Sequence, residues 1–326
     1  LHHYGVVEAR GGTMIGRNYG WTGYDGCRFI GTGTNQLLVG LQQDGVLVSS
    51  NLWLIGGVLQ GTNTLLGEMF LGANARIDRP PVGNGSTSIA PGSRLVVAGD
   101  ASFNTVRITN SGGLELRGDL NLTIQWSSTV VNQPGGVIRA VGHNRLTQWA
   151  GPNLIVNHGV FIKDGGAGPT SIALPFENHG DLEARNGVLE VGGSFIAQAG
   201  SRFFGAGTNR IAGGNGGNLT VAGPILSSNL WLMAGGTLQG TGSIAGVLHW
   251  SGGNFGQPAP NGPLTLATNC VLEVVGTADR WLHGIVTNSG HIRVADGSKF
   301  GFLNVGSRLV NLPGALFEFM GDGTLA

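Results

Sequence analysis

The chain contains one long segment twice. Residues 49–62 read SSNLWLIGGVLQGT, and residues 227–241 read SSNLWLMAGGTLQGT. With one inserted residue, Ala234, twelve of the fourteen aligned positions are identical, and the offset is 178 at the start and 179 at the end. A segment that recurs at a fixed distance is typical of repeat architectures, so it limits the possible folds more than any other feature of this sequence.

The surrounding sequence repeats at nearly the same offset. Four further pairs align in the same order: GVVEAR with GDLEAR, GCRFIGTGTN with GSRFFGAGTN, ITNSG with VTNSG, and NQPG with NLPG. Because order and spacing are both kept, the repeat covers the whole chain and not a single motif. We therefore expect one continuous β-solenoid over residues 1–326, built from two long repeats, 1–175 and 176–326, the second of them incomplete.

A shorter period lies within each long repeat. Corner glycines lie at positions 112, 135, 159 and 180, and each precedes an alternating segment. The steps between them are 23, 24 and 21. In GLELRG, Leu114 and Leu116 alternate with Glu115 and Arg117, which is the period of a half-buried strand. Helical spacing is nowhere sustained, so the sequence predicts an all-β protein.

A unit of 21–24 residues is too short to bury a core alone, but it suits one rung of a solenoid. Glycine and asparagine at the corners tolerate the positive φ that tight corners demand. The sequence therefore predicts a single-stranded, right-handed parallel β-helix of about 15 rungs, the hand following from the crossover preference. Two Pro-rich segments, 79–82 and 257–263, are expected to be outward loops between rungs and not linkers between domains.

Charge, hydropathy and cysteine content limit the partners and covalent links expected of this chain. The 18 basic residues balance 18 acidic ones without a basic run, so nucleic acid is not an expected partner. No stretch approaches the ~18 consecutive apolar residues of a membrane helix, so we expect no membrane insertion. Cys27 and Cys270 have Ser201 and Ser93 as counterparts in the other repeat, which favours two structural cysteines over a disulfide.

The repeat style is recognisable. GGTLQGTGSIAGVLHWSGGNF (Gly235–Phe255) is followed by LEVVG and TNSGHIRV. This order resembles the glycine-rich repeat regions of large bacterial secreted and surface β-solenoid proteins of the adhesin or autotransporter-passenger type. The resemblance implies an extracellular or cell-surface rod without enzymatic activity, and it brings no site residues with it.

The sequence holds no catalytic motif. Glu8 and Glu183 occupy the same repeat position, each with an Arg two residues later, which indicates a solvated face or a ladder partner. Acid pairs suited to general acid–base work on a sugar are absent from the sequence. Residues 213–217 (GGNGG) faintly resemble calcium-binding repeats but lack the Asp ligand, so they are expected to form a glycine corner. We expect no enzyme, no metal, no cofactor and no catalytic residue.

Trp53 and Trp231 are the candidate contact residues. They are equivalent in the two repeats and are flanked by leucines, so leucines facing the core would turn both indoles outward. We expect them to make a packing or surface contact, with packing favoured over recognition of a glycan.

The function expected from these patterns is structural. The chain would be an extracellular rod that forms a filament subunit or a cell-surface stalk. Because neither terminus shows a polar cap, the expected partner is a second copy, by end-to-end or lateral association. The alternative is an adhesin that binds surface glycans through its tryptophan face, and the second alternative is a polysaccharide-degrading β-helix enzyme.

Overall fold

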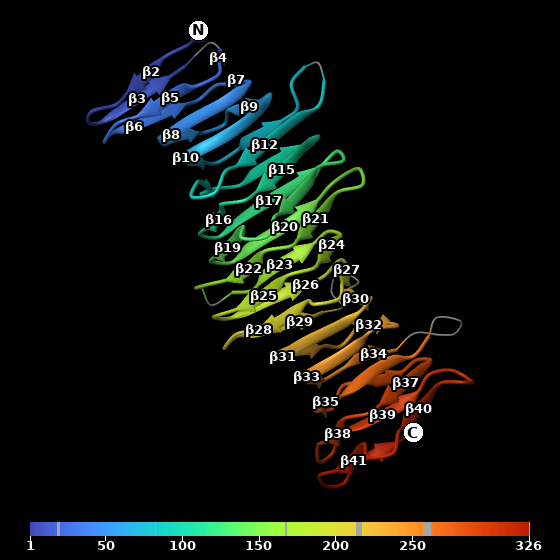
Figure 1. Ribbon diagram of the computed structural model, residues 1–326. Coiled ribbons are helices and arrows are strands. Elements are labelled where there is room, and N and C mark those ends of the chain that lie inside the picture. The colour runs from blue at the N-terminus through green and yellow to red at the C-terminus, as the bar shows by residue number, and fades with distance from the viewer. Residues whose placement is uncertain (18–19, 82, 167, 213–216, 257–261, 326) are drawn as a thin grey trace. The chain divides into compact units, whose positions relative to one another are not determined.

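The computed structural model describes residues 1–17, 20–81, 83–166, 168–212, 217–256 and 262–325. Within these ranges the regular elements are all β-strands, and neighbouring strands pair in parallel (Figure 1). The strands stack in about 15 turns, which confirms the predicted β-solenoid. Contacts divide the chain into two compact units, Leu1–Thr170 (unit 1) and Ser171–Ala326 (unit 2). That the two units form one continuous solenoid, and that its hand is right, stay predictions.

Each rung of unit 1 has three sides, because the chain forms three successive strands before it returns to the same sheet. The long strands β8 and β10 turn a corner without a break, so each supplies sides 2 and 3. Side 1 consists of β1 (His2–His3), β4 (Trp21–Gly23), β7 (Leu41–Gln43), β9 (Val58–Gln60), β11 (Ala75–Asp78), β14 (Ala101–Asn104), β17 (Leu120–Gln125) and β20 (Asn144–Gln148). Side 2 consists of β2 (Val6–Glu8), β5 (Cys27–Ile30), the first halves of β8 (Gly45–Leu54) and β10 (Thr62–Leu71), β12 (Gly85–Ile89), β15 (Val106–Asn110), β18 (Thr129–Asn132) and β21 (Leu154–Asn157). Side 3 consists of β3 (Thr13–Gly16), β6 (Thr34–Leu37), the second halves of β8 and β10, β13 (Arg94–Val97), β16 (Gly113–Arg117), β19 (Val137–Val141) and β22 (Val160–Lys163).

Unit 2 repeats this plan, and its sides are numbered by their counterparts in the long repeat. Here β31, β33 and β35 are the long strands that supply sides 2 and 3. Side 1 consists of β24 (Phe176–Asn178), β27 (Ser194–Ala197), β30 (Asn218–Val221), β32 (Thr237–Gly240), β34 (Gly253–Phe255), β36 (Arg280–Leu282), β39 (Lys299–Phe302) and β42 (Thr324–Leu325). Side 2 consists of β25 (Asp181–Ala184), β28 (Arg202–Phe204), the first halves of β31 (Pro224–Leu232), β33 (Ser243–Trp250) and β35 (Leu264–Val274), β37 (Ile285–Asn288) and β40 (Arg308–Asn311). Side 3 consists of β26 (Val188–Val191), β29 (Thr208–Ile211), the second halves of the three long strands, β38 (His291–Val294) and β41 (Leu316–Phe319). The remaining strand, β23 (Thr170–Ala173), begins at the last residue of unit 1.

The predicted alternation between core and surface is confirmed. In β16 the side chains of Leu114 and Leu116 are buried in the interior, and in β25 the same holds for Leu182 and Ala184. Glu115 turns outward but is only 7% exposed. Successive rungs place apolar residues in register, so the interior of each unit is a stack of side-chain rows whose burial drives folding.

Rung length varies more than the predicted 21–24 residues. One inward row of side 3 runs Leu37, Leu54, Leu71, Val97, Leu116, Ala140 and Lys163. Its last two steps fall within the predicted range, whereas the steps from 37 to 54, from 54 to 71 and from 97 to 116 are shorter and the step from 71 to 97 is longer. The long strands β8 and β10 shorten their rungs because they need no separate corner. The segment that contains Arg79–Pro81 lengthens the rung between β11 and β12, while residues 82 and 257–261 lie outside the described ranges.

The corners do not use asparagine in the predicted way. Among the described residues, the non-glycine positions with positive φ are Asn74, Thr105, Trp126 and Ser127. The corner asparagines Asn110, Asn132 and Asn157 are instead buried and hydrogen-bond to one another from rung to rung. The corner glycines are of two kinds. Gly135 has a φ of 84°. Gly112 does not have a positive φ, but a Cβ at this position would come within 2.4 Å of two carbonyl oxygens. At Gly112 glycine is therefore required by close approach of the backbone.

Candidate functional site

The duplicated segment forms a corner. In β8 the Ser49 hydroxyl donates to the Glu68 carbonyl at 2.6 Å and accepts the Leu52 amide at 3.0 Å. The Ser227 hydroxyl accepts the Leu230 amide at 3.0 Å in β31. These bonds replace ladder bonds lost where each long strand bends between sides 2 and 3. These bonds give Ser49 and Ser227 the same structural role in the two repeats.

The same corner carries an asparagine pair in each unit. The Asn35 side-chain amide donates to Asn51 Oδ1 at 2.6 Å, and the Asn209 amide donates to Asn229 Oδ1 at 2.7 Å. Asn51 and Asn229 in turn donate to backbone carbonyls of the rung before. The first half of the duplicated SSNLWL motif is thus explained by hydrogen bonding within the fold.

The two candidate tryptophans lie on the outer face of side 3. The leucines on either side of Trp53 are fully buried, and Trp53 itself is half-buried with its ring stacked on Phe70, 4.4 Å between centroids and 3° between planes. Trp231 stacks on His249 at 4.3 Å and 19°. A neighbouring rung therefore covers one face of each indole. That either ring contacts a ligand or another molecule stays a prediction.

Trp231 belongs to a row that crosses seven rungs of unit 2. The residues in register along this row of side 3 are Glu190, Arg210, Trp231, His249, Glu273, Arg293 and Glu318. Arg210 pairs with Glu190, and Arg293 lies 3.4 Å from Glu273 and 3.6 Å from Glu318. Opposite charges directly across a strand pair stabilise the sheet, so this row supports the stack from outside.

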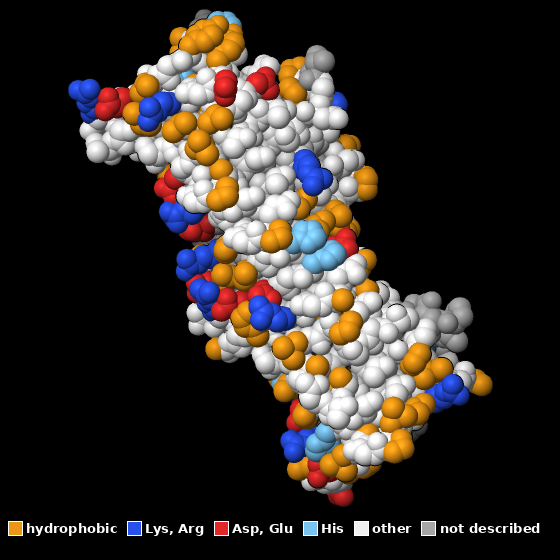
Figure 2. All heavy atoms as spheres, in the orientation of Figure 1, with side chains coloured by type: hydrophobic (Ala, Val, Ile, Leu, Met, Phe, Trp, Pro, Cys, Tyr) orange, Lys and Arg blue, Asp and Glu red, His pale blue; other side chains and the backbone are white. Residues whose placement is uncertain are grey.

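The matching row of unit 1 is more apolar around its tryptophan. Phe70 and Val96 stand where unit 2 has His249 and Glu273, and the row continues to Glu115 and Arg139. Glu115 accepts from Arg94 at 3.1 Å and Arg117 at 2.8 Å. Basic and acidic side chains lie together along the edge formed by β16, β19 and β22 in Figure 2.

The recurring acids singled out in the sequence form ion pairs within the fold. Glu8 and Glu183 pair with Arg10 and Arg185, each two residues later in the same chain segment, at 3.1 and 2.8 Å, and their ladder partners are instead Ile30 and Phe204. Within the described ranges no three His, Cys, Asp or Glu side chains converge as metal ligands. Residues 213–216 of the GGNGG segment lie outside those ranges.

Both cysteines are free and buried, so the predicted absence of a disulfide is confirmed. Burial raises the pKa of the Cys27 thiol to about 11, helped by the nearby Asp25 carboxylate. Burial alone raises the pKa of Cys270 to about 12. A thiol with so high a pKa is scarcely ionised at neutral pH, so neither is suited to act as a nucleophile.

The structure reveals a groove that the sequence alone did not suggest. It lies on side 1 of unit 1, over β11, β14, β17 and β20, with a volume of about 590 Å³. Its floor is an outward row of Arg76, Ser102, Thr123 and Thr147, in register on four successive rungs. Backbone pairing thus aligns four polar side chains along one line.

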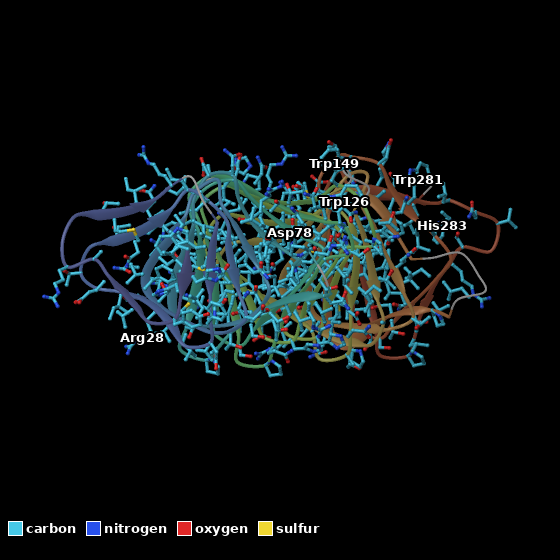
Figure 3. The ribbon with its side chains drawn as sticks, turned by 90° about the horizontal axis from the view of Figure 1, so that it is seen from above. Arg28, Asp78, Trp126, Trp149, Trp281 and His283 are labelled. Atoms are coloured by element: carbon cyan, nitrogen blue, oxygen red, sulfur yellow. The ribbon has the colours of Figure 1, made fainter. Side chains whose placement is uncertain are left out.

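Two exposed tryptophans directly follow β17 and β20, the last two strands of this groove, although neither is among the residues that line it. Trp149 is 77% exposed and lies two residues beyond Thr147, and Trp126 is 53% exposed and follows β17 directly. One rung of chain separates the two positions, and this spacing is the sequence signal that links them. The pairing of β17 with β20 places them on neighbouring rungs, and they lie near each other in Figure 3.

No described helix of this chain is long and apolar enough to cross a membrane. No protein-family model matches the sequence, and no curated protein matches it either. Among solved structures, the chain is similar to a crystal structure of the hyper-glycosylated fragment of TibA, residues 55–350, produced with TibC. That similarity covers 98% of this chain and 100% of the other, at 13% identity and a TM-score of 0.30.

Proposed function

We propose that this chain is a structural protein of the cell surface or extracellular space, in which the solenoid serves as a rod for a filament or stalk. The observation that carries the proposal is the continuity of its ladders from rung to rung. Backbone bonds, apolar rows and the external charge row all run in the direction in which rungs stack. Pulling on such a stack loads many parallel bonds together, and each rung depends only on its neighbours.

Location is tested with an antibody raised against the purified chain. Intact, unpermeabilised source cells, or their culture medium, should contain the antigen. Antigen found only after the cells are permeabilised would contradict the proposal.

Self-association is the second part of the proposal. A rung offers unpaired backbone groups wherever a stack stops, and another copy can pair with them in parallel. Sedimentation velocity over rising protein concentration should show species larger than the monomer, and electron microscopy should show elongated particles. A monomer at every concentration would refute the assembly, but it would leave the rod itself untouched.

We further propose that the chain performs no catalysis. The acids that recur in the repeats, Glu8 and Glu183, are already held by arginines. A reducing-sugar assay over a panel of plant, algal and bacterial polysaccharides should show no release above background. Steady release that survives repurification would instead favour a polysaccharide-degrading enzyme.

A further inference from the structure

The groove on side 1 of unit 1 has the shape and chemistry of a binding site. Its floor row crosses four rungs, and three rung steps of ~4.8 Å give it a length of about 14 Å. Asn74, Asp100 and Asn121 line one margin. A line of hydroxyl, amide and guanidinium groups at regular spacing suits a ligand that presents polar groups at similar spacing along a chain.

These polar groups keep hydrogen-bonding capacity toward solvent. Asp100, which lines the groove, accepts the Asn121 backbone amide through Oδ1 at 2.8 Å, and its second carboxylate oxygen takes no part in that bond. The Thr123 and Thr147 hydroxyls lie 3.4 Å apart, at the long end of a hydrogen bond. Arg76 is exposed and pairs with no carboxylate within the described ranges. Donors and acceptors of both kinds are therefore available.

The tryptophans supply an apolar platform next to this polar row. Trp149 directly follows β20, two residues beyond Thr147, a distance of at most about 7 Å along an extended chain. Trp126 has a φ of 59° and Ser127 a φ of 66°, a left-handed conformation that sterics disfavour for residues with a Cβ. The Trp126 backbone is fixed there by its amide, which donates to the Ala150 carbonyl at 2.6 Å. Such strain tends to persist where a side chain must be held in one direction.

The second repeat shows that rung packing does not require these features. Ser128 and Ser307 are equivalent, since each hydroxyl accepts a backbone amide at the same corner, at 3.1 Å in both. By the same offset Val305 stands in the place of Trp126. On side 1 of unit 2, Trp281 occupies the row position that Ser102 has in unit 1. Unit 2 therefore forms the same rungs, but the Trp281 indole lies at the position that forms part of the groove floor in unit 1.

We propose that this groove binds an uncharged oligosaccharide, with Trp126 and Trp149 stacking on sugar rings and the Arg76–Thr147 row bonding to hydroxyls. A sugar has an apolar face of C–H groups and a polar rim, which matches an aromatic platform beside a polar row. Asp100 and Arg76 oppose each other in charge, so the groove favours a neutral ligand over an acidic one. The site adds recognition to the proposed rod and does not depend on it.

The test measures binding of maltohexaose, cellohexaose, xylohexaose and chitohexaose to the whole chain, by calorimetry and by the shifts of indole N–H signals in NMR. At least one sugar should bind and shift the signals of Trp126 and Trp149. Trp149→Ala should weaken that binding about tenfold or more, which is ~1.4 kcal/mol. Trp126→Gly, which suits the left-handed backbone, and Arg76→Ala should weaken it as well.

Trp281→Ala is the matched control, because it removes an exposed indole from unit 2 and leaves the groove intact. Its affinity should equal that of the unaltered chain, and circular dichroism should show all four variants folded. The proposal is overturned if none of the four sugars binds, or if Trp281→Ala weakens binding as much as Trp149→Ala. It is also overturned if the groove variants change self-association but leave sugar binding unaltered.

Discussion

A corner asparagine in this solenoid bonds to the rungs on both sides of it. Asn132 Oδ1 accepts from Asn110 at 2.7 Å, and its amide donates to Asn157 Oδ1 at 2.7 Å and to the Gly136 carbonyl at 3.1 Å. Asn110, Asn132 and Asn157 are all fully buried. Asn110 Oδ1 at one end of this row is buried without a hydrogen-bond partner among the described residues, so the row depends on the bonds that its middle member makes.

Removal of the middle member should therefore be costly. Asn132→Ala leaves polar atoms of Asn110 and Asn157 buried without this partner, and we expect a loss of about 3 kcal/mol in the free energy of unfolding. Urea unfolding followed by circular dichroism measures it. The matched control is Asn311→Ala, the equivalent position in NLPG, where Asn311 is exposed and water can replace it. If the two variants lose equal stability, burial of the row is not the cause.

We expect His249 to make the stability of unit 2 depend on pH. Burial lowers its pKa below the ordinary value near 6.5, with Glu273 acting in the opposite direction. Since the unfolded chain then binds the proton more readily, stability is complete above pH ~6.5 and falls as the pH drops through the lowered pKa. The loss should stay below about 1 kcal/mol, because solvent screens a half-exposed ring.

His249→Phe tests this assignment, because Phe70 is the natural occupant of the position in unit 1. The variant should keep the stack on Trp231 and flatten the stability profile between pH 7 and about pH 5. Thermal melts across that range provide the measurement. An unchanged slope in the variant would assign the dependence to another group.

At the scale of elements, one buried arginine holds strand ends together. Arg280 opens β36 and is 1% exposed, and its guanidinium donates to the carbonyls of Lys299 at 2.8 Å and Gly276 at 2.6 Å. A longer contact of 3.4 Å reaches the Ser251 carbonyl. These carbonyls follow β33 and β35 or open β39, so a single side chain satisfies the ends of several elements.

Arg280→Met keeps much of the side-chain volume but removes every donor. Because several carbonyls then lose their partner inside the protein, we expect about 3 kcal/mol of destabilisation. The buried Trp250, which packs against Phe300 with 5.3 Å between centroids, reports unit 2 unfolding by its fluorescence. Arg308→Met on side 2, an exposed arginine that opens β40, is the control and should change little. Equal effects would mean that charge, and not the buried bonds, is responsible.

At the scale of the whole molecule, each compact unit contains one thiol that reports its integrity. Cys27 lies in unit 1 and Cys270 in unit 2, both fully buried. With pKa values raised to about 11 and about 12, both stay protonated and enclosed at pH 8. An aromatic disulfide reagent should therefore label neither thiol in the native protein and both in concentrated urea.

The variants Cys27→Ser and Cys270→Ser each leave one thiol, so they assign the labelling reaction to a single cysteine. Serine should be tolerated, since it occupies the matching positions in the other repeat. The urea dependence of each remaining thiol then gives the opening of its own unit. Rapid labelling of either thiol in native buffer would contradict the burial described above.

The sequence by itself determined the secondary structure, the parallel stacking and the direction of most side chains. Period-two alternation in GLELRG assigned Leu114 to the core and Arg117 to the surface, because successive side chains of a strand point to opposite faces. Repetition determined that rungs stack, since one rung cannot bury its apolar face alone. The outward turn of Trp53 and Trp231 follows from the same alternation.

Only the tertiary structure decided which side chains meet across rungs. Fewer residues separate Trp53 from its partner Phe70 than separate Phe70 from its partner Val96, because the bends and loops at the corners differ in length. Sequence spacing therefore does not give the register, and neither the asparagine rows nor the side 1 groove could be derived from it. Trp126 and Trp149 show this most clearly. One rung of chain separates them, and the pairing of β17 with β20 sets them on adjacent rungs beside a row of polar groups.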